Sequence, residues 1–307
     1  MQAGQPAESS GSLTIEQYQP KSMLHVPETK IPRARYPVID WHTHVTGAGT
    51  PGKDIRFGMT PETCLAVMNR KNIRTMVDLT GGYGQALRDA IAKLQMAHQG
   101  RFLVFTEPAY DRASEPNYAK HQGDLIDDAY RAGAKGLKVL KRLGLVLREN
   151  GTSALIRIDD PRFDPMWEAA GAHRLPVAIH SSDPQAFFLP IDRFNERWEE
   201  LNAHPDWGYY GQGTPSDREL QEARRNVMRR HPHTQFVCLH VADSEDLPYV
   251  SECLDSHPNM FVDIAARIGE LGRQPRTSQK FFDKYQDRIV FGTDASPGPA
   301  TPQADLR

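Results

Sequence analysis

The sequence has few cysteines and no long apolar run, and each shortage excludes a class of protein. Its three cysteines, Cys64, Cys238 and Cys253, have no CxxC spacing, so a disulfide framework is excluded. No apolar stretch approaches the ~20 residues of a membrane span, and the first residues do not have the pattern of a signal peptide. We therefore expect no membrane partner and a cytoplasmic location by default, with secretion left open.

The sequence also lacks an excess of charge of either sign. Lysine and arginine number 37 against 39 aspartates and glutamates, which gives a formal net charge of −2 over 307 residues. Because the basic residues are balanced and dispersed, nothing indicates a nucleic-acid-binding surface. A hydrophobic fraction of 39% and a charged fraction of 25% are ordinary for a globular protein. The length suits one large domain or two small ones.

From residue 36 onward, short apolar runs alternate with segments of helical spacing. Residues 1–35 are polar and proline-rich, and we expect an extended arm there. The alternation predicts βαβ units and a parallel sheet. Eight strands over about 260 residues favour an α/β fold of the (β/α)8 TIM-barrel type across 36–307. An open doubly wound sheet is the alternative, but it would need a glycine-rich fingerprint after its first strand. The predicted strands are 36–40, 73–80, 101–108, 134–141, 175–182, 234–243, 259–267 and 287–295, and the predicted helices are 61–72, 84–98, 117–132, 164–173, 216–230 and 245–257.

Two segments depart from this repeat. Residues 183–216, rich in aromatic and turn residues, form a long insertion after the fifth predicted strand. Such a loop lies at the catalytic end of a barrel, so we expect it to cap the substrate. The alternative is a packed loop without function.

After "FGTDASP" the chain continues for ten residues that predict no eighth helix. We therefore expect the last helix to be missing, and a truncated, catalytically impaired barrel remains an alternative.

Metal-capable side chains stand at the ends of several predicted strands. "DWHTH" places His42 and His44 two residues apart, and therefore on one face of a strand. His180 ends the fifth predicted strand, His240 the sixth and Asp294 the eighth. A parallel barrel gathers these ends around one central point. Each histidine alone would fit a structural role, but imidazoles together with a carboxylate suit Zn²⁺ or a similar divalent cation.

The motifs "DWHTH", "AIHSSDP", "CLHVAD" and "FGTDA", in this order, resemble those of the amidohydrolase superfamily. The similarity is to the amidohydrolase-related branch, which includes aminocarboxymuconate semialdehyde decarboxylase, and it covers about residues 36–295. The resemblance implies that His42, His44, His180 and Asp294 hold one divalent metal ion, zinc or else manganese. It further implies that His240 contacts the substrate or activates the attacking water.

The chemistry of such a site leads to two enzymatic functions. A divalent metal lowers the pKa of a bound water to about 7, while Asp294 could take up the proton and His240 polarise the scissile carbonyl. We therefore predict a metal-dependent hydrolase of an amide, ester or lactone, with Asp294 and His240 catalytic. A metal-dependent, non-oxidative decarboxylase of a small carboxylic acid is the alternative, because it needs the same mononuclear site.

Two basic residues favour a small-molecule substrate that bears a carboxylate. Lys138 ends the fourth predicted strand and Arg267 follows the seventh, so both could face the substrate. Lys138 has two alternative roles. It could be a carboxylated lysine that bridges two metal ions, as in other amidohydrolases, or it could form a structural ion pair. The alternative role for Arg267 is structural, a salt bridge to Glu270 or to the insertion. The oligomeric state is not readable from the sequence, and a homo-oligomer stays open.

Overall fold

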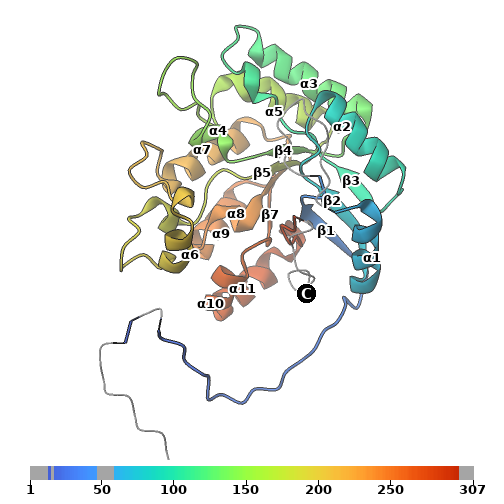
Figure 1. Ribbon diagram of the computed structural model, residues 1–307. Helices are drawn as coiled ribbons and strands as arrows, with labels where there is room; N and C mark the ends of the chain where they lie inside the picture. Colours follow the sequence, from blue (N-terminus) through green and yellow to red (C-terminus); the bar gives the residue numbers. More distant parts are fainter. Residues whose placement is uncertain (1–12, 15–16, 47–58, 297–307) are drawn as a thin grey trace, which may run out of the picture. The chain divides into compact units, whose positions relative to one another are not determined.

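The structure is a computed structural model that describes residues 13–14, 17–46 and 59–296. It divides into two compact units, Met1–Pro32 and Arg33–Arg307. The described residues of the first unit are exposed and form neither helix nor strand. All the helices and strands belong to the second unit (Figure 1).

In the described part of the second unit, eight short parallel strands form the centre. They pair in sequence order, as β1-β2-β3 and as β4-β5-β6-β7-β8. Each strand overlaps one of the apolar runs from which it was predicted. The strands are β1 Val38–Thr43, β2 Ile73–Asp78, β3 Phe102–Val104, β4 Leu137–Val139, β5 Val177–Ile179, β6 Phe236–Cys238, β7 Met260–Asp263 and β8 Ile289–Val290.

Hydrogen bonds beyond the ends of these strands close the two sheets into one barrel. At one seam Thr106, which follows β3, pairs in parallel with Leu137 of β4. At the other seam Thr43 of β1 pairs with Ala295, and further backbone hydrogen bonds of 2.8–2.9 Å run along the same seam. The fold is therefore the predicted α/β barrel and not an open doubly wound sheet.

Helices follow the strands and surround them (Figure 1). The six predicted helices are present in the described residues, but five others were not predicted. Three of these, α4, α6 and α8, are only four to six residues long. In the remaining two, α10 and α11, glycines and Pro275 interrupt the helical pattern. No helix in the described part of the chain is both long and apolar enough to cross a membrane. The predicted absence of an eighth helix concerns residues 297–307, which lie outside the described residues. The helices are α1 Pro61–Lys71, α2 Gly84–Ala90 with a π-helical continuation Ile91–Met96, α3 Tyr118–Ala132, α4 Arg142–Leu145, α5 Asp164–Ala172, α6 Trp198–Ala203, α7 Asp217–Arg230, α8 Leu239–Asp243, α9 Leu247–Ser256, α10 Ile268–Arg273 and α11 Pro275–Tyr285.

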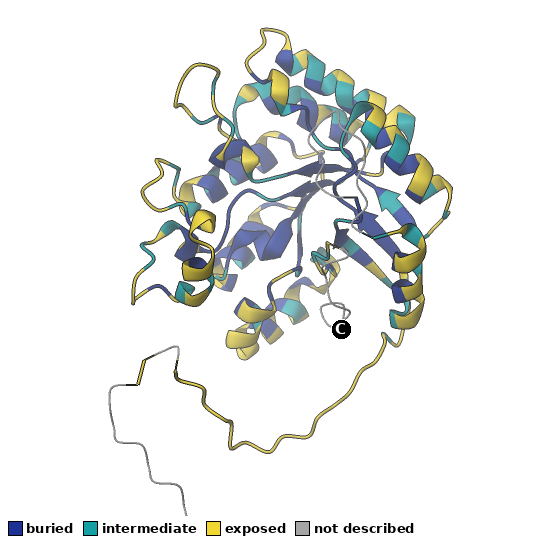
Figure 2. Ribbon diagram, in the orientation of Figure 1, coloured by how far each residue is buried: buried dark blue, intermediate teal, exposed yellow. Residues whose placement is uncertain are grey.

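The core has an inner and an outer part. A larger hydrophobic cluster fills the space between the strands and the outer helices. Most strand residues are buried, whereas the outward faces of the helices are exposed (Figure 2). Because side chains also fill the inside of the barrel, a site can form only at its ends. The inner cluster consists of Val77, Leu79, Phe105, Ala178, Val237 and Leu239.

Candidate active site

Side chains at the carboxyl ends of four strands meet at one end of the barrel. The ring of His42 lies 5.2 Å from that of His44 and 4.9 Å from that of His240, measured between centroids. The rings of His180 and His240 are 4.5 Å apart. Asp294 Oδ1 lies 3.1 Å from Nε2 of His42 and 3.0 Å from Nε2 of His44. The structure thus brings together all five metal-capable residues singled out from the sequence.

A buried carboxylate fixes the orientation of His42. Its Nδ1 lies 2.6 Å from Asp263 Oδ2, and neither side chain is exposed. A histidine that donates one ring N–H to a carboxylate presents its other nitrogen to a metal. The ligand atoms of His42, His44 and Asp294 lie within 4.8 Å of one another. Two imidazole nitrogens and a carboxylate oxygen at this spacing fit a divalent cation.

Protonation of these groups follows from their surroundings. Burial and Lys138 lower the pKa of His42, but its hydrogen bonds to Asp263 and Asp294 raise it more, so the net shift is upward. Burial lowers the pKa of His44 to about 4. Although burial opposes it, hydrogen bonds from the two histidines hold the pKa of Asp294 far below its usual range. The carboxylate is therefore ionised between the two imidazoles.

His180 lies beside this group. Within the described residues, no compact set of three ligand atoms includes it. Its Nε2 is buried without a hydrogen-bond partner, and the nearest carboxylate oxygens are Asp183 Oδ1 at 3.6 Å and Asp243 Oδ1 at 3.7 Å. A buried nitrogen without a partner costs about 1–3 kcal/mol. A cation shared with its neighbours would satisfy it, so His180 also fits the predicted role of a ligand.

The tautomer of His240 is set by the backbone. Its Nδ1 lies 2.9 Å from the carbonyl oxygen of Ala265, and a carbonyl only accepts hydrogen bonds, so the ring proton is on Nδ1. Burial, together with His180 and His42, lowers the pKa of His240 well below its ordinary value. The imidazole is therefore neutral, with a free lone pair on Nε2. In this state it can accept a proton but cannot donate a hydrogen bond from Nε2.

His240 also opens an unusual backbone turn. Residues 240–243 have φ between 54° and 58°, the left-handed region, and none of them is glycine. This conformation costs roughly 1–2 kcal/mol for each such residue. Asp243 supports the turn, because its Oδ2 accepts hydrogen bonds from the N–H groups of Ser181 and Ser182 and pairs with Arg224 at 2.6 Å. The site therefore includes a strained segment that needs continuous support.

The two basic residues predicted at the site are both buried there. Lys138 Nζ lies 3.5 Å from Nε2 of His42, and burial lowers the pKa of Lys138 to about 8 although nearby carboxylates oppose the shift. Arg267 donates a hydrogen bond to the carbonyl of Ala266 at 2.9 Å, and its Nε has no partner. Glu270, the alternative partner offered for Arg267, pairs with Arg197 instead. Arg267 therefore keeps an unsatisfied donor at the site.

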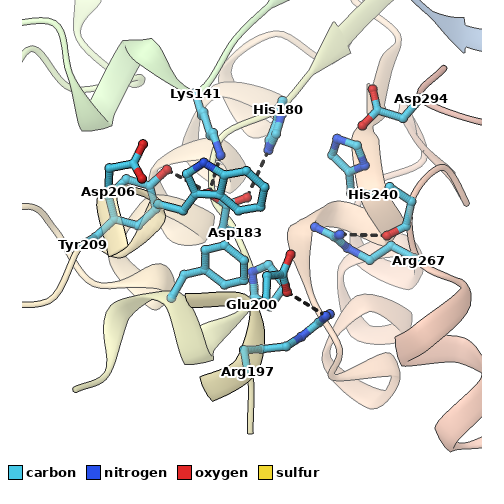
Figure 3. A pocket seen from close by; sticks show the side chains of 14 residues that line it. Lys141, His180, Asp183, Arg197, Glu200, Asp206, Tyr209, His240, Arg267 and Asp294 are labelled. Carbon is cyan, nitrogen blue, oxygen red and sulfur yellow. Dashed lines mark hydrogen bonds and ion pairs between the residues drawn. The ribbon is translucent and has the colours of Figure 1, made fainter. Parts of the chain in front are cut away.

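A pocket of about 510 Å³ opens beside these groups, lined by His180, His240, Arg267 and Asp294 (Figure 3). Much of its remaining wall comes from the insertion 183–216. The insertion contributes aromatic and charged side chains and includes α6 and two 3-10 turns, Gln185–Phe188 and Pro205–Trp207. The pocket thus has polar groups at its base and aromatic rings in its wall, as small-molecule sites commonly do.

Asp183 ties the insertion to the barrel. Its Oδ2 pairs with Lys141 Nζ at 2.5 Å and accepts a hydrogen bond from the Tyr209 hydroxyl at 2.8 Å (Figure 3). Although burial opposes it, His180 and Lys141 hold the pKa of Asp183 well below its usual range. Sequence reasoning missed Asp183 and Asp243. A signal existed, because "HSSD" and "HVAD" each place an aspartate three residues after a strand-end histidine.

Several solved structures have a similar fold. A 2,6-dihydroxybenzoate decarboxylase complexed with 2,6-dihydroxybenzoate is 18% identical, with a TM-score of 0.54 over 88% of this chain and 95% of that one. A dihydroxybenzoic acid decarboxylase from Polaromonas sp. JS666, with bound manganese and the inhibitor 2-nitroresorcinol, is 15% identical, with a TM-score of 0.55 over 89% and 93%. An uncharacterized TIM-barrel protein from Bordetella bronchiseptica is 13% identical, with a TM-score of 0.53 over 85% and 88%.

At these identities the likenesses establish the fold, and the family rests on a separate match. No curated protein sequence gives a significant match. A family model described as Amidohydrolase matches residues 39–302, a range that includes all but the first residue of the described strands and all the residues that meet at the carboxyl end. The chain therefore belongs to the amidohydrolase family, which consists of metal-dependent enzymes built on a TIM barrel.

Proposed function

We propose that this chain is a metal-dependent hydrolase of an amide, ester or lactone. The observation that carries the proposal is the convergence of Nε2 of His42 and His44 on one oxygen of Asp294. These three residues, with the unpartnered Nε2 of His180 beside them, would hold one divalent ion, zinc or manganese. The ion, when bound, lowers the pKa of water to about 7 and polarises a carbonyl.

His240 is the proposed proton acceptor. Because the Ala265 carbonyl fixes the proton on Nδ1, Nε2 faces the site as a base. It would take a proton from the water that attacks the carbonyl and return it to the leaving nitrogen or oxygen. This assignment replaces the sequence-based role of carbonyl polarisation, which requires a proton on Nε2. Asp294, ionised between two imidazoles, would serve mainly to bind the cation.

The pocket supports a planar substrate with a carboxylate. Arg267 is only 8% exposed, and its Nε has no partner, so a bound carboxylate would satisfy a donor that is otherwise unpaired. Phe187 and Trp207 in the pocket wall offer apolar surface for a flat ring. Lys138, whose Nζ lies 3.5 Å from Nε2 of His42, would contribute positive charge beside the proposed metal ligands.

Non-oxidative decarboxylation of a small carboxylic acid is the second candidate, and the unpaired Nε of Arg267 favours it. The two candidates differ in what His240 must do. Hydrolysis begins with removal of a proton from water, whereas decarboxylation requires delivery of a proton to the carbon that loses CO₂. The free lone pair on Nε2 of His240 supports hydrolysis.

Metal content tests the part of the proposal that both candidates share. We expect about one zinc or manganese ion per chain by plasma mass spectrometry, and none in the His42→Ala/His44→Ala double variant. Two ions per chain would instead support a bridging role for Lys138. A folded native protein that binds neither zinc nor manganese would contradict both candidate functions.

Turnover separates the two candidates. The zinc- and manganese-loaded proteins would be assayed with dihydrocoumarin, a lactone, and with 2,6-dihydroxybenzoate, the carboxylic acid named with one of the similar structures. Ring opening of the lactone that is lost in His240→Gln supports the hydrolase. Release of CO₂ from the acid without lactone hydrolysis would replace it with the decarboxylase. The double histidine variant is the control for metal-independent hydrolysis.

A further inference from the structure

The left-handed turn at residues 240–243 is supported from an outer helix. Arg224 belongs to α7, and its side chain is only 1% exposed. Its Nη2 donates a hydrogen bond to the carbonyl of Ala242 at 2.9 Å, and its Nη1 pairs with Asp243 Oδ2 at 2.6 Å. A guanidinium presents its donors in a rigid fork, so it fixes the backbone and the side chain of the turn together.

The same ion pair reaches the loop that carries the other pocket histidine. Asp243 Oδ2 accepts hydrogen bonds from the N–H of Ser181 at 3.0 Å and from the N–H of Ser182 at 3.1 Å. Arg224 also donates to the hydroxyl of Ser181 at 3.0 Å. Because Ser181 directly follows His180, the ion pair joins the segment after β5 to the segment after β6.

We propose that Arg224 and Asp243 form a positioning pair that sets the relative placement of His180 and His240. Arg224 is not one of the described residues that line the pocket, so it acts through Asp243. The pair holds His240 in the position in which its Nδ1 hydrogen-bonds to the Ala265 carbonyl. Its kinetic effect rests on the proposed function, in which Nε2 of His240 accepts a proton.

The contacts explain why this pair is needed. Four successive non-glycine residues in the left-handed region do not hold that conformation by themselves. If Arg224 is shortened, Asp243 keeps its serine N–H donors, but the Ala242 carbonyl loses the donor that Arg224 provides. The turn can then relax, and His240 moves away from the Ala265 carbonyl.

The first test follows His240 directly, without a substrate. Side-chain ¹⁵N NMR of the full-length protein reports which ring nitrogen carries the proton, and His240→Gln assigns the signal. Arg224→Lys keeps the charge but cannot make both contacts of the fork. We expect the Nδ1–H tautomer in the native protein and a mixture of tautomers in Arg224→Lys. Arg225→Lys is the matched control, because Arg225 is the next residue of α7 and pairs with Glu222 and Glu252.

The second test separates positioning from stability. Arg224→Lys should lower kcat by at least tenfold with KM within twofold and with unchanged metal content. Adding Ala242→Gly, which permits the left-handed backbone without strain, should restore the native tautomer and most of kcat. If no substrate is found, the proposed function fails, but the NMR result still decides this proposal.

A folded Arg224→Lys protein with the native tautomer of His240 would overturn the proposal. If Arg224→Lys does not fold, Ser181→Ala would be read in the same NMR experiment. It removes one partner of Arg224 while leaving the ion pair in place, so a smaller shift in the same direction supports the proposal. An unchanged His240 signal in that variant contradicts it.

Discussion

Gly292 permits the close approach of the chain after β8 to His42. A Cβ added at this position would lie 2.7 Å from the Cβ of His42 and 3.3 Å from that of Ala265. Neither neighbour is the flexible end of a long side chain, so one of the backbones would have to move. The absence of a side chain at residue 292 therefore helps to place His42 and Asp294 together.

Gly292→Ala should displace His42 and weaken the site. We expect a loss of about 1–3 kcal/mol in the free energy of unfolding, as for other overpacked positions, and less than one metal ion per chain. Urea denaturation and metal analysis would measure the two effects. Gly272→Ala is the control, because a Cβ there meets nothing within 4 Å and alanine favours helix α10. Equal losses in both variants would contradict the proposed contact.

Asp78 should make stability depend on pH. Burial raises its pKa to about 6 although Thr46 and Thr80 donate hydrogen bonds to it, whereas its pKa in an unfolded chain is about 3.9. The folded state therefore binds the proton more tightly, so the contribution of Asp78 favours folding at low pH and declines as pH rises through 6. From pH 4.5 to pH 7 the native protein should lose about 2 kcal/mol relative to Asp78→Asn.

Urea denaturation of both proteins at both pH values would measure this difference. Asp128→Asn, at an exposed position, is the control and should show no such change relative to the native protein. A native protein whose stability relative to Asp78→Asn rises between pH 4.5 and pH 7 would show that the sign is wrong.

At the scale of elements, two ion pairs join the insertion to α10. Arg197 pairs with Glu270, whose side chain is only 4% exposed. Glu196 pairs with Arg273 at 2.8 Å, and both of these side chains are about half exposed. Since α10 begins directly after Arg267, these pairs connect the pocket wall to the helix beside the proposed carboxylate-binding residue. Exposed pairs contribute little, whereas loss of one partner from a buried pair is costly.

The two pairs should therefore differ in how strongly they hold the insertion. Glu270→Gln should increase amide hydrogen exchange in residues 195–203 by roughly tenfold, the factor that corresponds to about 1.4 kcal/mol, since Arg197 then keeps only its more exposed partner within the insertion, Glu200. Glu196→Gln, the matched variant of the exposed pair, should change exchange by less than about twofold. Mass spectrometry of exchanged peptides would compare them. An equal increase in both variants would contradict the distinction.

At the scale of the whole molecule, a metal ion held by residues at the carboxyl ends of β1, β5 and β8 would bind the folded barrel and not the unfolded chain. Zinc at about 100 times its dissociation constant should then stabilise the protein by about 2.7 kcal/mol, seen as a rise in melting temperature that a chelator reverses. The His42→Ala/His44→Ala variant should not respond. An equal rise in the melting temperature of that variant would show that the ion binds at another site.

Much of this architecture could be predicted from local patterns. Alternating strands and helices indicated the barrel, and histidines at strand ends indicated its active end. The left-handed turn could not be predicted, because "HVAD" contains no glycine to indicate it. The role of Arg224 was also hidden, since its position on α7 marks it only as a charged helical residue. The contact of Asp263 with His42 could not be predicted either, because the two residues are 221 positions apart and only tertiary packing brings them together.

The seam between β1 and β8 has a consequence for how the protein is made. His44 and Asp294, which meet there, are 250 positions apart in the sequence. At about 5–20 residues per second, a ribosome needs roughly 10–50 s to synthesise the chain between them. Throughout this interval the nascent chain has His42 and His44 but no Asp294 beside them. Closure of the barrel and completion of the proposed cation-binding group are therefore one event, which cannot precede synthesis of the segment after β8.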